Sequence, residues 1–190
     1  MEKFIKEYPT PEIVGCLFRS INNYLEGVII GKNTSRLLEK VLLSCQSEEV
    51  AENEIVQFQS QKFCEYMWHH YPDNLENNIG SHIVRLFFQF VCGVYVSTQD
   101  KVYSSKSVVI STPMEDNYME RLHDLIKRFL MNPHINQLLT NEYMSSTLQI
   151  LLVICSVRCP EKFKEVTKHL MAVLCDIDQK VSKKDSGDIK

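Results

Sequence analysis

The sequence has little of the two residues that most often interrupt helices, and none of the long apolar runs that cross membranes. Its 190 residues include 6 glycines and 6 prolines, and no stretch reaches the roughly 18–20 consecutive apolar residues of a membrane span. Hydrophobic residues make up 44% of the chain and charged residues 24%, an ordinary globular composition. We therefore expect a domain with a hydrophobic core and no association with a membrane.

An excess of positive charge is also missing. The formal net charge is -3 at pH 7 and the isoelectric point is about 6.1. No global basic field is available to attract a polyanion. A nucleic-acid ligand would therefore need a local basic surface, which composition alone neither shows nor excludes.

No secretory signal precedes the cysteines, and their number is odd. Reduced thiols in the cytosol or nucleus are therefore expected rather than disulfides. Most of them lie in apolar helical runs, where a free cysteine behaves as a small buried hydrophobe. The 7 cysteines are Cys16, Cys45, Cys64, Cys92, Cys155, Cys159 and Cys175.

Motifs that carry catalysis are missing too. The chain has no GxSxG, no HExxH and no glycine-rich loop that would cradle a phosphate. Cys64, His69 and His70 invite a zinc interpretation, but their spacing matches no zinc pattern. Trp68 and Tyr71 beside them are interpreted as residues packed under Pro72, although such an aromatic patch is also suited to stacking on nucleotides. We predict no enzyme activity, no cofactor and no metal site.

What the sequence does contain is apolar residues at helical spacing along nearly its whole length. This predicts an all-α fold of about nine helices, after a polar lead-in at residues 1–10. Gly27 to Asn33 is expected to break the first helix. Pro72 is expected to end the helix that contains residues 58–71. The expected helices are one from Thr10 to about residue 26, one at 34–45, one that opens at Ser47 and continues through 58–71, a short turn at 75–78, one that begins with Ser81 within 77–93, one starting at Thr112, a short one from 132 through 139, one at 143–157, and a last one that carries Phe163 to Val181.

Two stretches break this pattern. Residues 94–112 are rich in Ser, Thr and Lys, and we interpret them as a mobile inserted loop. A short hairpin is the alternative, because Val94 to Val96 and Val108 to Ile110 are β-prone. Residues 183–190 are charged and are expected to be disordered. The helical domain is thus predicted to span residues 11–182.

One pattern occurs three times, and internal self-similarity indicates a repeat architecture. Each copy has an asparagine-containing polar opening, a small polar residue, a variable polar residue, a long polar group four positions after the first, and an apolar run. Stacked units would bury apolar faces that one unit cannot bury alone, which predicts an α-solenoid. The three triplets are Ser35, Arg36 and Glu39; Ser81, His82 and Arg85; and Ser145, Ser146 and Gln149.

The three positions of a triplet fall on one side of a helix. The first and third could hydrogen-bond one base edge, and a flat residue between them could stack on a base. Ser35 with Glu39 suits the donor-rich edge of guanine. Arg85 suits an edge that carries acceptors. The competing interpretation is that each serine is only an N-cap and that the long groups are solvated helix charges.

Segments TSRLLEKVLL, GSHIVRLFF and SSTLQILLVI, with the opening PEIVGCLFRSINNYLEGV, resemble the helices of divergent Pumilio (PUF) repeats, specifically those of the nucleolar branch of that family. The resemblance covers most of residues 11–157 at the level of motifs. It implies a PUF-type α-solenoid that binds single-stranded or structured RNA. The expected ligand is the ribosomal RNA precursor, in the nucleus and nucleolus, during small-subunit ribosome biogenesis.

The resemblance further implies that the nine triplet residues contact RNA and that the chain works as a monomer beside pre-ribosomal proteins. The intervals between copies are longer and less regular than in standard PUF repeats. The alternative is a protein–protein interaction scaffold of the HEAT or armadillo kind, without RNA binding. The acidic isoelectric point favours the scaffold, and the repeated triplets favour RNA.

Overall fold

The computed structural model describes residues 10–96, 108–113, 117–131 and 139–185. Within these ranges the chain has nine helices and one pair of short strands, which confirms the all-α fold class. None of the described helices is long and apolar enough to cross a membrane. Contacts divide the chain into two compact units, Met1–Tyr118 and Met119–Lys190, which are described separately. A single domain over residues 11–182 stays a prediction.

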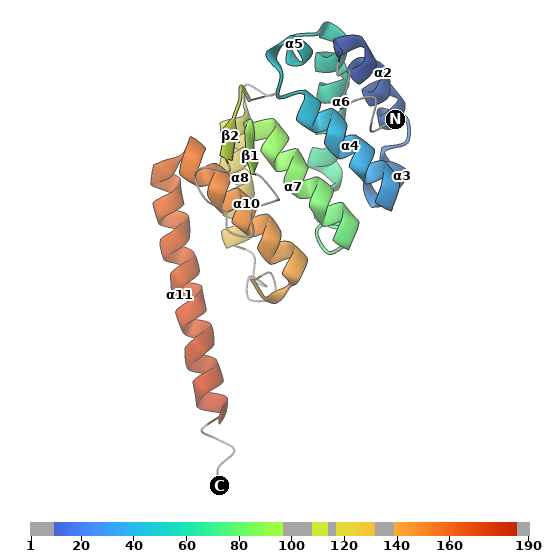
Figure 1. Cartoon of the computed structure of the whole chain (residues 1–190). Helices are drawn as coiled ribbons and strands as arrows, with labels where there is room; N and C mark the ends of the chain where they lie inside the picture. The colour runs from blue at the N-terminus through green and yellow to red at the C-terminus, as the bar shows by residue number, and fades with distance from the viewer. Residues whose placement is uncertain (1–9, 97–107, 114–116, 132–138, 186–190) are drawn as a thin grey trace. The chain divides into compact units, whose positions relative to one another are not determined.

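The helices of the first unit pack in pairs. α2 packs against α6 and α4 packs against α7, while α2 also contacts α4 and α6 contacts α7. Figure 1 shows α4 and α7 side by side and running in the same direction. A solenoid arrangement stays a prediction. The bounds are α2 Pro11–Asn22, α3 Leu25–Ile30, α4 Lys32–Ser44, α5 Glu48–Ala51, α6 Glu54–Asn74 and α7 Asn78–Cys92.

A cluster of buried phenylalanine rings joins α2, α6 and α7. The Phe63 ring lies 5.7 Å from Phe18, 5.9 Å from Phe87 and 6.2 Å from Phe90, measured between centroids. All four side chains are fully buried. Tilted and edge-to-face pairs at these distances add to the free energy gained by burying the rings. Phe63 is thus the point at which three helices meet.

Trp68 and Tyr71 belong to the same core. Trp68 meets Phe87 edge-on at 4.9 Å and Tyr71 at 6.2 Å. Both rings pack in this aromatic cluster, and their packing under Pro72 stays a prediction. Five of the seven cysteines are also buried and all seven are free thiols, with Cys16 and Cys175 exposed.

Asparagines cap three of the helices. Asn53, Asn77 and Asn141 each accept hydrogen bonds from the backbone N–H groups two and three residues later. These bonds satisfy donors that the first turn of a helix leaves unpaired. The first copy of the recurring pattern differs, because Gly31 occupies the capping position of α4 and Asn33 lies inside its first turn. The three copies are therefore less alike in their openings than the sequence indicates.

One predicted helix break is right in part and one is wrong. Within Gly27 to Asn33 the chain breaks at Gly31, between α3 and α4, whereas Gly27 lies within α3, and the first helix ends earlier than predicted, at Asn22. An isolated glycine in a helix costs about 1 kcal/mol relative to alanine, which tertiary contacts of the buried Val28 and Ile29 can offset. Pro72 lies inside the last turn of α6 rather than ending the helix. The helix continues only two residues beyond it, so the disruption is confined to the end.

The hairpin alternative for residues 94–112 holds over the part that the structure describes. β1 (Val94–Val96) and β2 (Val108–Ile110) pair antiparallel, with Val94 opposite Ile110. The interpretation of these residues as loop is wrong, and residues 97–107 lie outside the described residues. Gly93 permits the turn out of α7 because its φ is +59° and a Cβ there would lie 2.5 Å from the Ser111 carbonyl oxygen.

The second unit contains α8 (Tyr118–Leu130), α10 (Glu142–Arg158) and α11 (Pro160–Asp185), with α10 packed against α11. The predicted helix start at Thr112 is wrong, because Pro113 is not helical. The predicted disorder from residue 183 is wrong up to Asp185, where α11 ends. The short helix expected from residue 132 lies outside the described residues up to 138, as does the tail from 186.

The difference between Asn77 and Asn33 can be tested directly. Asn77→Ala removes the cap of α7 and should lower the free energy of unfolding by about 1 kcal/mol. Asn33→Ala makes the same substitution within the first turn of α4, where Gly31 is the capping residue. We expect it to leave stability nearly unchanged or slightly raised. Urea unfolding followed by circular dichroism measures both, and equal losses would contradict this assignment of the caps.

Candidate functional site

The structure brings two of the three triplets together. Ser35, Arg36 and Glu39 lie on α4, and the second triplet lies on α7 beside it (Figure 1). The third triplet lies on α10, in the second unit. The candidate site is therefore the face formed by α4 and α7, which we call the α4–α7 face.

The serine at the first position makes the same hydrogen bond in every copy. Ser35, Ser81 and Ser145 each donate to the backbone carbonyl three residues earlier, at 3.2, 3.1 and 3.1 Å. None of them is the capping residue of its helix, so the N-cap interpretation is wrong. Ser35 is 4% exposed and Ser81 fully buried. Both side chains therefore lie beneath the surface of the α4–α7 face. Their contact with RNA stays a prediction.

Ser81 positions the long group of its own triplet. The Arg85 Nη1 atom donates to Ser81 Oγ at 3.4 Å, while Ser81 Oγ donates to the Asn78 carbonyl. Arg85 is half-buried, and a guanidinium that is partly fixed loses less rotamer entropy when it meets a ligand. The residue pair that the sequence places four positions apart is thus in contact.

A hydrogen bond between His82 and Glu39, which is an ion pair when His82 is protonated, bridges the two helices. His82 Nε2 of α7 lies 3.5 Å from Glu39 Oε2 of α4, with 32% and 24% of the respective side chains exposed. The hydrogen bond from His82 lowers the pKa of the Glu39 carboxyl from its ordinary value. Partial burial opposes this shift, and the positive charges of His82, Lys40 and Arg36 add to it. Glu39 is therefore an ionised acceptor within a mainly basic surrounding.

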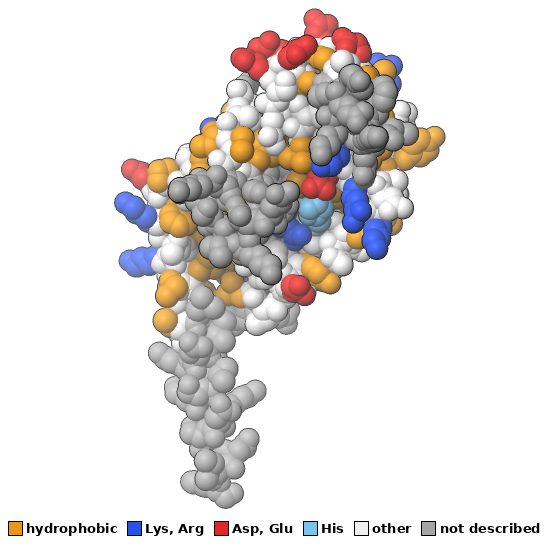
Figure 2. All heavy atoms as spheres, viewed as in Figure 1, with side chains coloured by type: hydrophobic (Ala, Val, Ile, Leu, Met, Phe, Trp, Pro, Cys, Tyr) orange, Lys and Arg blue, Asp and Glu red, His pale blue; other side chains and the backbone are white. Residues whose placement is uncertain are grey.

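The sequence reasoning missed two further basic residues of this face. Lys32, Arg36 and Lys40 recur every four positions along α4 and are all exposed. That spacing places them on one side of the helix. It can be read in the sequence and could have indicated a basic face. Within the described ranges none of the three forms an ion pair. Figure 2 shows Lys and Arg side chains gathered around a histidine over α4 and α7.

The negative charge of the first unit collects elsewhere. Glu48, Glu49, Glu52 and Glu54 are exposed at α5 and the start of α6. In Figure 2 acidic side chains crowd one end of the molecule, away from the basic side chains of the α4–α7 face. The acidic isoelectric point thus coexists with a locally basic surface.

The third triplet shows no comparable arrangement in the second unit. Ser145 and Ser146 both donate to the Glu142 carbonyl, at 3.1 and 2.8 Å, and Gln149 is exposed. Their hydroxyls are engaged with the backbone of α10. Whether these residues contact RNA stays a prediction.

The histidines of α6 do not converge with a cysteine. His70 stacks on Tyr66 with ring centroids 4.3 Å apart, and His69 is exposed, whereas Cys64 is buried. Among the residues that the structure describes, no group of three or more His, Cys, Asp or Glu side chains could hold a metal ion. The α4–α7 face is accordingly a site of hydrogen-bonding, stacking and charged groups.

A comparison of the chain with protein-family models, with curated proteins and with solved structures finds no match. The resemblance to PUF repeats therefore rests on the motifs of the sequence. The geometry of the α4–α7 face is the independent observation that bears on function.

Glu39 predicts a pH dependence of stability. A carboxyl group whose pKa is lowered by folding stabilises the protein above the pKa it has when unfolded. This contribution is lost as the pH falls through the folded-state value. Glu39→Gln should lower the free energy of unfolding by less than about 1 kcal/mol near pH 6, as is usual for a partly exposed pair. The difference from the wild type should become smaller as the pH is lowered to 3.

Glu49→Gln is the matched control, because Glu49 is exposed and lies on α5, away from His82. Urea unfolding at pH 6 and pH 3 compares both variants with the wild type. If the effect of Glu39→Gln is the same at the two pH values, the ion pair does not contribute as described.

Proposed function

We propose that this protein binds RNA through the α4–α7 face, as an α-solenoid of divergent PUF-like repeats. The observation that carries the proposal is the stacking of α4 on α7, which brings the heads of two recurring segments together across the Glu39–His82 pair. Repeat proteins use such stacks to line one surface with equivalent residues. The α4–α7 face also carries the exposed cations of α4.

The chemistry of the face suits single-stranded RNA. Lys32, Arg36 and Lys40 form a line of charge that can follow a phosphate backbone. The flat groups of His82 and Arg85 can stack on unpaired bases. Glu39 supplies one acceptor among these donors and can receive a hydrogen bond from the donor edge of a base. Backbone attraction, stacking and one polar contact are thus available together.

The motif resemblance supports a more specific role. We propose the ribosomal RNA precursor as the ligand, during small-subunit ribosome biogenesis in the nucleus and nucleolus. The chain would act there as a monomer beside pre-ribosomal proteins, without an enzymatic activity of its own. These statements rest on the segments TSRLLEKVLL, GSHIVRLFF and SSTLQILLVI.

The competing proposal is a protein-interaction scaffold without RNA binding. The acidic surface at α5 favours it, because Glu48, Glu49 and Glu52 would repel a polyanion. The two proposals differ in which surface matters. RNA requires the cations of α4, whereas a scaffold has no need of them.

Charge reversal on α4 separates the two. Arg36→Glu with Lys40→Glu should abolish most binding to labelled single-stranded RNA, since both residues border Glu39 on the exposed side of α4. The milder pair Arg36→Gln with Lys40→Gln should reduce the slope of log K against log salt by about 1.4, at about 0.7 for each phosphate contact.

Lys164→Glu with Lys168→Glu is the matched control. It makes the same change in net charge on exposed residues of α11, in the second unit. Fluorescence polarisation at several salt concentrations measures all of these variants. Equal losses for the two charge reversals would show only a general effect of net charge, and no loss with either would favour the scaffold.

Stacking by His82 gives a separate prediction. His82→Ala should weaken RNA binding by about 1–3 kcal/mol, the usual contribution of one stacked base, without changing the salt slope. His82→Phe keeps a flat ring and should recover most of the affinity, although it cannot bond Glu39. The same polarisation assay measures both. If phenylalanine is as weak as alanine, His82 acts through its hydrogen bond rather than by stacking.

A further inference from the structure

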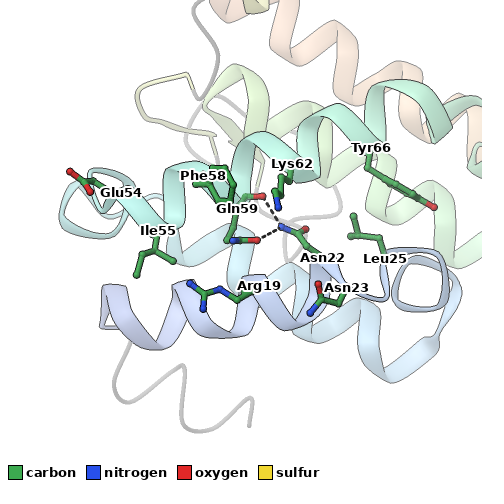
Figure 3. A pocket seen from close by; sticks show the side chains of 10 residues that line it. All are labelled: Arg19, Asn22, Asn23, Leu25, Glu54, Ile55, Phe58, Gln59, Lys62 and Tyr66. Atoms are coloured by element: carbon green, nitrogen blue, oxygen red, sulfur yellow. Dashed lines mark hydrogen bonds between the residues drawn. The ribbon is translucent and has the colours of Figure 1, made fainter.

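A groove of about 680 Å³ lies between α2 and α6, and no part of the proposed RNA site lines it. Figure 3 shows side chains from both helices around it, with Leu25 of α3 at one end and Glu54 at the other. The residues that line the groove include both polar and apolar side chains. The argument uses Arg19, Asn22, Ile55, Phe58, Gln59 and Lys62.

Two amide side chains meet across the groove. Asn22 Nδ2 donates to the Gln59 backbone carbonyl at 2.8 Å and to Gln59 Oε1 at 2.9 Å (Figure 3). Asn22 Oδ1 is left buried with no hydrogen-bond partner. The Gln59 amide nitrogen makes no hydrogen bond within the part of the chain described. Asn22 Oδ1 has almost no accessible surface and Gln59 is 4% exposed, so this pair joins α2 to α6 beneath the groove and offers no open acceptor to a ligand.

The rim of the groove carries apolar side chains that stay exposed in the described structure. Phe58 is 56% exposed and Ile55 is 39% exposed. The Lys62 ammonium lies 4.6 Å from the centroid of the Phe58 ring, so that this ring already holds a cation on one face. An aromatic ring and an aliphatic side chain beside exposed cations suit a ligand that offers both apolar and charged side chains.

The charges of the groove select among such ligands. Arg19 comes from α2 and Lys62 from α6, and both are exposed. Neither forms an ion pair with any carboxylate in the described ranges. Together they favour a negative charge between the two helices. Glu54 ends the groove, and the glutamates of α5 lie before it in sequence.

This distribution disfavours a nucleic acid. A phosphate backbone that followed the groove past Arg19 would meet Glu54 and then the acidic end of α5. A peptide can match both signs, with an acidic side chain between Arg19 and Lys62 and a neutral or basic one near Glu54. Charge complementarity of this kind sets specificity and register more than total affinity.

We propose that the groove between α2 and α6 binds an extended peptide segment of a partner protein, with an acidic side chain held between Arg19 and Lys62. An apolar side chain of the segment packs on the exposed Ile55 and Phe58. The proposal does not depend on RNA binding, because the two surfaces share no proposed contact residue.

The test uses fluorescein-labelled nine-residue peptide pools in which the central position is fixed as Asp, Lys or Ala and the other positions are randomised. Fluorescence polarisation with the full chain should show the Asp pool binding about tenfold more tightly than the Lys pool, a difference of about 1.4 kcal/mol. Arg19→Glu with Lys62→Glu should reverse the preference in favour of the Lys pool.

Arg36→Glu with Lys40→Glu is the matched control, because it makes the same charge change on α4 in the same unit. It should keep the wild-type preference for the Asp pool. Thermal unfolding of both variants checks the fold, and Arg19→Gln with Lys62→Gln replaces the groove variant if the latter unfolds. That milder pair should lose the preference without reversing it.

Three results would overturn the proposal. The wild type could bind the Asp and Lys pools equally, or the groove variant could keep the wild-type preference. In the third case, the groove variant would lose binding to single-stranded RNA while the α4 variant kept it, and the groove would then be a nucleic-acid site. Failure of RNA binding by every form, with peptide selection intact, would count against the proposed function alone.

Discussion

The contacts of Phe63 hold the first unit together. Its ring touches Phe18 of α2 and both Phe87 and Phe90 of α7, so that three helices share one buried cluster. Fully burying a phenylalanine contributes about 1.5–3 kcal/mol, and rings in contact constrain one another's orientation. Because α6 is fixed to α2 on one side and to α7 on the other, this cluster positions both the groove and the α4–α7 face.

The arrangement also explains how an acidic chain can carry a basic surface. The cations of α4 lie every four residues on an exposed side of the helix, whereas a group of four glutamates lies on α5 and the start of α6 and beside them. Net charge is a sum over the chain and records none of this separation. Glu39 is the acidic residue that enters the basic side, and it is held there by His82.

Sequence periodicity predicted helices well and their ends less well. Asn77 and Asn141 mark helix starts because a capping bond is local. Gly27 and Pro72 misled the prediction, because tertiary contacts and position within a turn decide whether such residues end a helix. The strands at Val94 and Val108 were left ambiguous, since pairing joins residues that are separated in the chain.

The candidate site divides in the same way. The sequence by itself determined the all-α class, the three triplets and the spacing that puts Ser81 in reach of Arg85, because all of these follow from helical geometry within one segment. Only the tertiary structure decided that Ser35 and Ser81 are buried and that Glu39 meets His82. Burial and contacts between helices depend on which faces pack together. That choice is made by the whole core around Phe63, and no single segment encodes it.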